Sequence, residues 1–335
     1  MTKTTTKMKK MILSALLLCM ATVGALAQEK VPTNRYSMKL KVEADGSYSL
    51  LNAQRYAKFI DLSPLSDLLI PYEHQNNRLS SKDYKGVEVK EVIYRTHTGY
   101  ELQLAIDMAV SETPAPVMFF VHGGGWARGT NSSSRSLSQY LAKQKGITGV
   151  RVQYSLAPQP GANVEVSIAD IEAAVEYIRQ HATELNIDPS RMGFYGTSAG
   201  AHLAGVGAMK TPEAKVFVGV SGIYDLETAA ICMRSKQEER INYFCQRDPA
   251  VLRRSSPQQI IPKRSKCAVL LFCGTADITV ECEQSRNFAD ALKRKGVKEV
   301  ELAVYDYYDH NLSSKTSDKM EEIFFRTVDF IVAHL

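Results

Sequence analysis

Regular patterning of apolar and polar positions begins near residue 87 of this 335-residue chain. Residues 87–94 and 102–108 alternate apolar and polar side chains, and the turn residues Thr98 and Gly99 lie between them, which predicts an antiparallel strand pair. The run 117–121 is apolar throughout, as is typical of a strand buried on both faces. Further strands are predicted at 149–154, 192–195, 216–220, 268–272 and 300–305.

Stretches with a helical period separate these predicted strands. Residues 166–182 place Ile168, Ile171, Val175 and Ile178 on one side of a helix, and the period ends before Asp188. Residues 288–295 and 320–335 are also predicted to be helical. Strands that alternate with helices favour an α/β fold with a mostly parallel central sheet and helices on both of its faces.

The regular part is interpreted as one domain over residues 86–335. Residues 28–85 mix short apolar pieces with polar stretches and have no clear period, so they are interpreted as an N-terminal arm or a cap segment. The polar stretch 227–257 inside the domain is also expected to belong to a cap over the site.

Residues 1–27 have the three parts of a secretory signal peptide: a basic start, an apolar core and a cleavage site at Ala25–Ala27. The expectation is export to the periplasm or the extracellular space. The apolar run is shorter than the ~20 residues that span a bilayer, which argues against stable membrane insertion. Lipidation at Cys19 is the alternative, but Leu18 stands where a small residue is expected. The four lysines of this segment supply most of the formal net charge of +5, so nucleic acid is not expected as a partner.

Five cysteines follow residue 27, and an odd number in an exported protein leaves at least one thiol unpaired within the chain. Cys232 and Cys245 lie in the polar stretch 227–257, where a disulfide between them is one hypothesis and two free thiols are the alternative. Cys267 and Cys273 lie in or beside an apolar run and are expected to be buried thiols. The cysteine spacing does not resemble a zinc site, and neither a metal ion nor another cofactor is expected.

Residues 196–200 read Gly-Thr-Ser-Ala-Gly, which is the Gly-x-Ser-x-Gly pattern of a sharp strand–turn–helix connection. Glycine is needed on both sides of Ser198 because strand and helix nearly touch in such a turn. The serine hydroxyl is then exposed near a helix N-terminus, where developing negative charge is stabilised. Ser198 is therefore the predicted nucleophile.

A nucleophilic serine requires a base, and the base requires an acid that orients it. His310 follows the last predicted strand in a polar loop and is the predicted base, because catalytic groups of this fold class lie at the carboxyl ends of strands. Asp277, which follows the strand 268–272, is the predicted acid, and Asp306 and Asp309 are the alternatives. The order serine, aspartate, histidine is that of α/β-hydrolases.

Three glycines follow His122 at the end of the run 117–121, where bare backbone N–H groups can approach a substrate oxygen. Together with the amide of Ala199 they are predicted to form an oxyanion hole. Trp126, the one tryptophan of the chain, is a candidate substrate-binding residue and could equally cover the core. A site lined by Trp126 and by tyrosines would suit sugar rings or an aromatic acyl group. The tyrosines considered are Tyr154, Tyr224, Tyr305, Tyr307 and Tyr308.

These motifs resemble the hormone-sensitive-lipase-like and acetylxylan/feruloyl-esterase-like (BD-FAE-type) branch of the α/β-hydrolases. The resemblance covers roughly residues 87–335 and implies the α/β-hydrolase fold, with oxyanion amides at Gly124 and Gly125. The chain departs from the branch at Ser155, where arginine is usual, and at Ala201, where glycine is usual. The resemblance rests on residues 122–126, 154–158, the helix around Asp170, 187–191 and 196–204, and more weakly on 221–226 and 274–277.

The predicted function is that of an exported serine carboxylesterase that removes acetyl or feruloyl groups from carbohydrates or hydrolyses other short-chain esters. The alternatives are a prolyl-oligopeptidase-type peptidase, a lipase-like esterase and a binding protein without catalysis on the same scaffold. The absence of a long propeller-like N-terminal domain and the three-glycine loop argue against a peptidase, and the complete set of triad candidates argues against a binding protein. The expected partner is a small-molecule or glycan ester, and the sequence leaves the oligomeric state open.

Overall fold

A computed structural model describes residues 40–42, 48–50, 80–263, 265–312 and 320–335. The chain divides into two compact units, residues 1–55 and 56–335. In the first unit, β1 (Leu40–Val42) and β2 (Tyr48–Leu50) form a short antiparallel pair. The predicted signal peptide 1–27 and most of the predicted arm lie outside the described residues, and both stay predictions.

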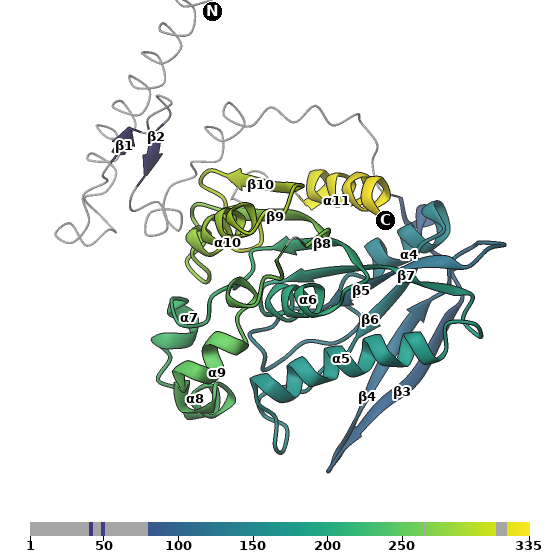
Figure 1. Cartoon of the computed structure of the whole chain (residues 1–335), viewed down its shortest axis with the longest axis horizontal. Helices are drawn as coiled ribbons and strands as arrows, with labels where there is room; N and C mark the ends of the chain where they lie inside the picture. The colour runs from purple at the N-terminus through teal and green to yellow at the C-terminus, as the bar shows by residue number, and fades with distance from the viewer. Residues whose placement is uncertain (1–39, 43–47, 51–79, 264, 313–319) are drawn as a thin grey trace, which may run out of the picture. The chain divides into compact units, whose positions relative to one another are not determined.

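The second unit is built on an eight-stranded sheet in the order β10-β9-β8-β7-β5-β6-β4-β3 (Figure 1). Strands β3 and β4 form the predicted antiparallel hairpin, β4 also pairs antiparallel with β6, and the other pairs are parallel. The predicted α/β class and α/β-hydrolase fold are confirmed. The strands are β3 (Val89–His97), β4 (Tyr100–Asp107), β5 (Ala115–Val121), β6 (Thr148–Val152), β7 (Ile187–Thr197), β8 (Ala214–Val220), β9 (Ala268–Gly274) and β10 (Val300–Tyr305).

Helices cover both faces of this sheet. Strand β5 shows why: Val117 and Phe119 point into one buried cluster, whereas Met118 and Phe120 point into the other. The first cluster is completed by α5 (Val164–Gln180), α6 (Ala199–Lys210) and α10 (Cys282–Arg294). The second is completed by α4 (Arg135–Lys145) and α11 (Met320–His334).

The predicted helix at 166–182 is observed as α5, two residues earlier in the chain. It begins there because the Asn163 side chain accepts hydrogen bonds from the N–H groups of Glu165 and Val166. The stretch 227–257 winds into short helices rather than a loop. They are α7 (Ala230–Met233), α8 (Glu238–Tyr243), the 3₁₀ turn η2 (Cys245–Arg247) and α9 (Pro249–Arg254). Two further 3₁₀ turns are η1 (Ser81–Asp83) and η3 (Pro257–Gln259).

A buried ion pair joins the antiparallel part of the sheet to helix α4. Arg151 on β6 donates from Nε and Nη2 to both oxygens of Asp107 at the end of β4, over 2.7 and 3.0 Å. Ser138 and Gln139 of α4 donate to the same carboxylate. Because every oxygen of the buried carboxylate is paired, its desolvation is compensated by charge-assisted hydrogen bonds.

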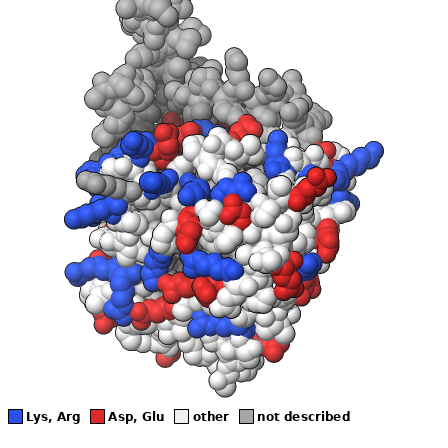
Figure 2. Space-filling model, turned by 45° about the vertical axis from the view of Figure 1, so that its right-hand side comes forward, with Lys and Arg blue, Asp and Glu red and all other residues white. Residues whose placement is uncertain are grey.

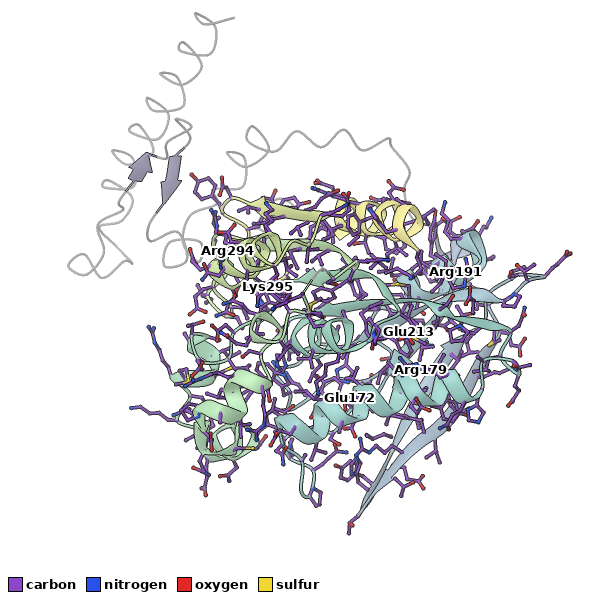
Figure 3. All side chains as sticks on the ribbon, in the orientation of Figure 1. Glu172, Arg179, Arg191, Glu213, Arg294 and Lys295 are labelled. Carbon is purple, nitrogen blue, oxygen red and sulfur yellow. A yellow bond between two sulfur atoms is a disulfide. The ribbon has the colours of Figure 1, made fainter. Side chains whose placement is uncertain are left out.

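The surface carries charges of both signs. On the face drawn in Figure 2, Lys and Arg side chains are interspersed with Asp and Glu. Several form ion pairs at the surface, such as the half-buried Arg179 with Glu213 at 2.7 Å and the exposed Lys210 with Glu172; Figure 3 labels Arg179, Glu213 and Glu172. Exposed pairs of this kind contribute little to stability, so the fold rests on its buried clusters. Within the described residues, no helix combines the length and the apolar character that a membrane crossing requires.

Candidate active site

Ser198 occupies the turn between β7 and α6 with a backbone φ of 54° and ψ of −124°, a conformation that is costly for a side chain with a Cβ. The two flanking glycines permit it. A Cβ on Gly196 would come within 2.3 Å of the Gly200 carbonyl oxygen, and one on Gly200 within 2.1 Å of the Val121 oxygen. The Ser198 amide donates to the Val220 carbonyl at 2.8 Å, which fixes the turn to the neighbouring strand. The half-buried serine is thus held at the carboxyl end of the sheet.

A chain of hydrogen bonds joins the three predicted catalytic side chains. His310 Nε2 lies 2.9 Å from Ser198 Oγ, and His310 Nδ1 lies 2.6 Å from Asp277 Oδ2. An ionised carboxylate can only accept, so Nδ1 carries the proton and Nε2 of the neutral ring accepts from the serine hydroxyl. This arrangement prepares the hydroxyl to lose its proton to the ring.

The Asp277 carboxylate is fixed by its own loop. Its side chain is 1% exposed, and Oδ1 accepts the N–H groups of Thr279 and Val280 at 2.7 and 2.8 Å. Oδ2 therefore faces His310. The alternative acids lie elsewhere: Asp309 accepts from the N–H of Asn311, and burial is the main cause that raises the pKa of Asp306.

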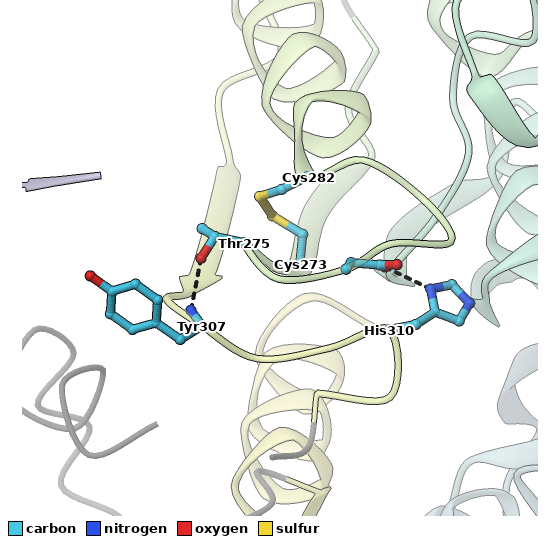
Figure 4. The surroundings of a disulfide bond; sticks show 6 residues. Cys273, Thr275, Cys282, Tyr307 and His310 are labelled. Atoms are coloured by element: carbon cyan, nitrogen blue, oxygen red, sulfur yellow. Dashed lines mark hydrogen bonds and ion pairs between the residues drawn. A yellow bond between two sulfur atoms is a disulfide. The ribbon is translucent and has the colours of Figure 1, made fainter. Parts of the chain in front are cut away.

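The loops that carry the acid and the base are joined through their backbones. Ala276 donates to the Tyr308 carbonyl at 3.0 Å, and the Thr275 hydroxyl accepts the N–H of Tyr307 at 2.7 Å (Figure 4). Gly274 permits this approach, because a Cβ there would lie 2.2 Å from the Tyr308 oxygen. These contacts fix the position of His310 relative to Asp277.

A disulfide between Cys273 and Cys282 closes the loop that contains Asp277 (Figure 4). Cys273 is near the end of β9 and Cys282 is the first residue of α10, with a Cα–Cα distance of 5.3 Å. The expectation that Cys273 is a free thiol was wrong, because its partner lies across a turn whose geometry the sequence does not reveal.

The hypothesis of a bridge between Cys232 and Cys245 is also not met, since both are free thiols. Cys232 points into the core from α7, whereas Cys245 lies half-buried in η2. Cys267 is a buried thiol as predicted, and burial raises its pKa to about 12.

The three-glycine loop packs directly against the nucleophile. A Cβ on Gly123 would lie 3.3 Å from the Cβ of Ser198. Gly124 and Gly125 have φ angles of 120° and 63°, which favour glycine. Ala199 is the first residue of α6, so its N–H has no acceptor within the helix. In the described part of the chain, the amides of Gly124, Gly125 and Ala199 have no protein acceptor. They are the donors that the predicted oxyanion hole requires.

Buried aromatic residues hold this loop from behind. The Tyr154 hydroxyl donates to the His122 carbonyl at 3.0 Å, and the two rings stack at 4.4 Å. Burial lowers the pKa of His122, so the ring is neutral near pH 7. Both residues position the glycines and do not themselves reach Ser198 through any hydrogen bond in the described structure.

Arg95 and His97 are positioning residues that the sequence analysis did not find, and they act through Asp170. Asp170 accepts the N–H of Ser155 at 2.8 Å, and its other oxygen pairs with Arg95 at 3.1 Å and His97 at 2.9 Å. Both residues belong to β3, and Arg95 supplies a positive partner at a site where Ser155 provides none. The predicted strand ends at residue 94, whereas β3 continues to His97, and its alternating side chains are the sequence signal that could have suggested them.

Trp126 belongs to the core and does not line the site. Its indole is fully buried, its Nε1–H donates to Nδ1 of His202 at 3.2 Å, and its ring contacts Phe244 at 5.0 Å. The assignment of Trp126 to substrate binding is therefore corrected. His202 is buried in the core, where burial lowers its pKa to about 4 and its Nε2–H donates to the Ser255 carbonyl. The candidate tyrosines are buried as well: Tyr154, Tyr224, Tyr305, Tyr307 and Tyr308 are at most 5% exposed.

Within the described residues, no group of three or more His, Cys, Asp or Glu side chains is arranged to hold a metal ion. The structure brings together the Ser198 hydroxyl, an imidazole and a carboxylate, which are groups that nucleophilic chemistry uses.

Peptide mapping without reductant should recover Cys273 linked to Cys282, with Cys232, Cys245 and Cys267 alkylated as free thiols. Closing so short a loop contributes about 3 kcal/mol to the free energy of unfolding. A dithiol reductant should therefore lower the melting temperature of the wild type and leave that of Cys282→Ser unchanged. Recovery of alkylated Cys273 and Cys282 from unreduced protein would contradict the bridge.

Curated relatives match parts of the chain. A probable isoprenylcysteine α-carbonyl methylesterase of Arabidopsis thaliana is 26% identical over 211 residues, which are 56% of this chain and 44% of that protein. An acetyl esterase of Salmonella schwarzengrund is 35% identical over 92 residues, 28% of each chain. The chain thus spans less than half the length of these two relatives.

Solved structures of esterase 2 from Thermogutta terrifontis share the fold. The native form has a TM-score of 0.61 at 25% identity and covers 75% of this chain and 92% of that chain. The propionate-bound form has the same TM-score and identity and covers 75% and 95%. Residues 104–292, more than half of the sequence, match the BD-FAE family. The Ser198 turn, the three-glycine loop and Asp277 lie within these matched residues, and the chain belongs to the BD-FAE family.

Proposed function

We propose that the protein is a serine carboxylesterase. One observation carries this proposal: Ser198, His310 and Asp277 form a continuous hydrogen-bonded chain beside the free amides of the three-glycine loop. Nucleophile, base, orienting acid and oxyanion donors are the complete set of groups that acyl transfer to serine requires. The fold and the family membership agree with this chemistry.

In the proposed mechanism, Ser198 Oγ attacks the ester carbonyl carbon while His310 Nε2 takes its proton. Asp277 stabilises the imidazolium that forms and holds its tautomer. The amides of Gly124, Gly125 and Ala199 donate to the oxyanion of the tetrahedral intermediate. His310 then protonates the leaving alcohol, and a water molecule, deprotonated by the same ring, releases the acid from Ser198.

The substrate class proposed is a short acyl ester, foremost an acetyl ester of a carbohydrate. The relatives support the acyl part: one is named an acetyl esterase, and the Thermogutta enzyme binds propionate. The aromatic lining that favoured a feruloyl group is not available, because Trp126 and the candidate tyrosines are buried. Acetyl is therefore preferred over feruloyl in this proposal.

We also propose that the protein is exported. The basic and apolar pattern of residues 1–27 is the first support. The Cys273–Cys282 disulfide is the second, because structural disulfides persist in oxidising compartments and are rare in the cytosol.

The wild type should hydrolyse p-nitrophenyl acetate and butyrate far faster than the decanoate, and it should release acetate from acetylated xylan oligosaccharides. Ser198→Ala is the control without the proposed nucleophile. It should hydrolyse none of these esters above background and should keep the wild-type circular dichroism spectrum. Activity that increases with chain length and needs a lipid interface would identify a lipase, and cleavage of peptides without cleavage of esters would identify a peptidase.

Asp277→Asn should lower kcat on p-nitrophenyl acetate by about 10⁴-fold, the loss typical when the acid of a serine triad can no longer fix the histidine tautomer. Asp309→Asn is the control, since it changes the residue next to His310 and should cost far less. A larger loss in Asp309→Asn than in Asp277→Asn would contradict the assignment of the acid.

A further inference from the structure

One face of α8 lies against the turn that follows the three glycines. The rings of Tyr243 and Phe244 contact the Trp126 indole at 6.2 and 5.0 Å between centroids. Arg240 precedes them by three and four positions and so lies on the same helical face. The stretch 227–257 therefore brings a guanidinium to the loop that carries the proposed oxyanion amides.

The position of this guanidinium is defined by Gly125. Arg240 Nη2 lies 3.1 Å from the point that a Cβ on Gly125 would occupy. Gly125 belongs to the three-glycine loop, and a Cβ on Gly123 of the same loop would lie 3.3 Å from Ser198 Cβ. A side chain at this place can reach a group that is bonded close to the ester being cleaved.

Arg240 has no acceptor within hydrogen-bond or ion-pair distance in the described structure, although its side chain is half-buried. Its neighbours in the segment are used differently. Arg247 donates to the carbonyls of Cys232 and Ser235, and Arg253 and Arg254 pair with glutamates. The guanidinium of Arg240 thus has unused N–H donors beside the three-glycine loop.

Asp225 and Glu281 lie near Cys232, as Arg240 does, but neither carboxylate pairs with Arg240. Asp225 accepts from the Glu227 amide and from Gln258, and Glu281 stays beyond ion-pair distance from Arg240. A half-buried guanidinium without a partner has lost part of its hydration and gains most from an anion that accepts two parallel hydrogen bonds.

We propose that Arg240 binds a carboxylate of the substrate and gives the site a preference for anionic esters. This inference rests on the proposed esterase function and adds the charge of the preferred substrate to it. The carboxylate could belong to the alcohol, as in an acetylated uronic acid, or to the acyl group, as in the monoester of a dicarboxylic acid. The chemistry recognised is the same, and separate substrates distinguish the two sources.

The experiment compares each anionic ester with a neutral isostere. For the acyl side, the pair is the p-nitrophenyl monoester of glutaric acid and that of glutaramic acid. For the alcohol side, it is O-acetyl methyl glucuronoside and its carboxamide. The measured quantity is the ratio of kcat/KM for the anion to kcat/KM for the isostere, in which general damage to the site cancels.

The ratio should exceed one for the wild type with at least one pair, and the pair that shows it identifies the source. Arg240→Met, which keeps the apolar stem, should lower that ratio about tenfold or more, because a hydrogen-bonded charge pair is lost. Arg240→Lys should lower it less. Arg234→Met is the control: it removes an exposed charge of the same segment and should keep the wild-type ratio.

Equal ratios in the wild type and Arg240→Met would overturn the proposal. If Arg240→Met lowered kcat/KM equally for anionic and neutral esters, Arg240 would stabilise the oxyanion or the fold instead, and the proposal would be overturned as well. If the wild type hydrolyses neutral esters without preferring either anion, only this inference fails. If it hydrolyses no ester, the proposed function itself fails.

Discussion

The close approach of backbones at the carboxyl end of the sheet is the constraint on which the site depends. At Gly196, Gly200 and Gly274 a Cβ would lie within 2.3 Å of a carbonyl oxygen of the facing segment. Real Cβ atoms do not come so near. Any other residue at Gly196 would push β7 away from α6, and at Gly200 it would push α6 away from the end of β5. At Gly274 it would separate the loop that carries Asp277 from the loop that carries His310. Because these segments touch, Ser198, Asp277 and His310 meet within hydrogen-bond distance, and the three-glycine loop packs against Ser198.

A layer of buried side chains around the site keeps this arrangement in place. Tyr154 supports the His122 carbonyl, and Asp170 supports the residue after Tyr154. On the other side, the Cys273–Cys282 disulfide ties the two ends of the Asp277 loop to β9 and α10. The groups proposed to act on substrate are therefore few, and most of the aromatic residues nearby are structural. The segment 227–257 differs from this layer because it brings Arg240 to the three-glycine loop with its donors unused.

Short-range patterns predicted the fold, and they selected three residues that the structure joins by hydrogen bonds. Continuous apolar runs identify buried strands, and the Gly-x-Ser-x-Gly spacing identifies a turn whose constraint is local. The contacts between distant segments could not be read in this way. The partner of Cys273 depends on how the Asp277 loop returns to α10, and the burial of Trp126 depends on where α8 packs. The pairing of Arg95 and His97 with Asp170 joins an edge strand to a helix that follows more than seventy residues later. The export signal and most of the arm lie outside the described residues and stay predictions.

The central claim is that Ser198 is a nucleophile activated by His310 and Asp277. A fluorophosphonate probe tests it most directly, because the probe bonds covalently to an activated serine. Intact mass and peptide mapping should show one probe per chain, on Ser198, and labelling should be greatly slowed in His310→Ala. Stoichiometric labelling of another residue, or labelling of Ser198 at the same rate without His310, would contradict the account.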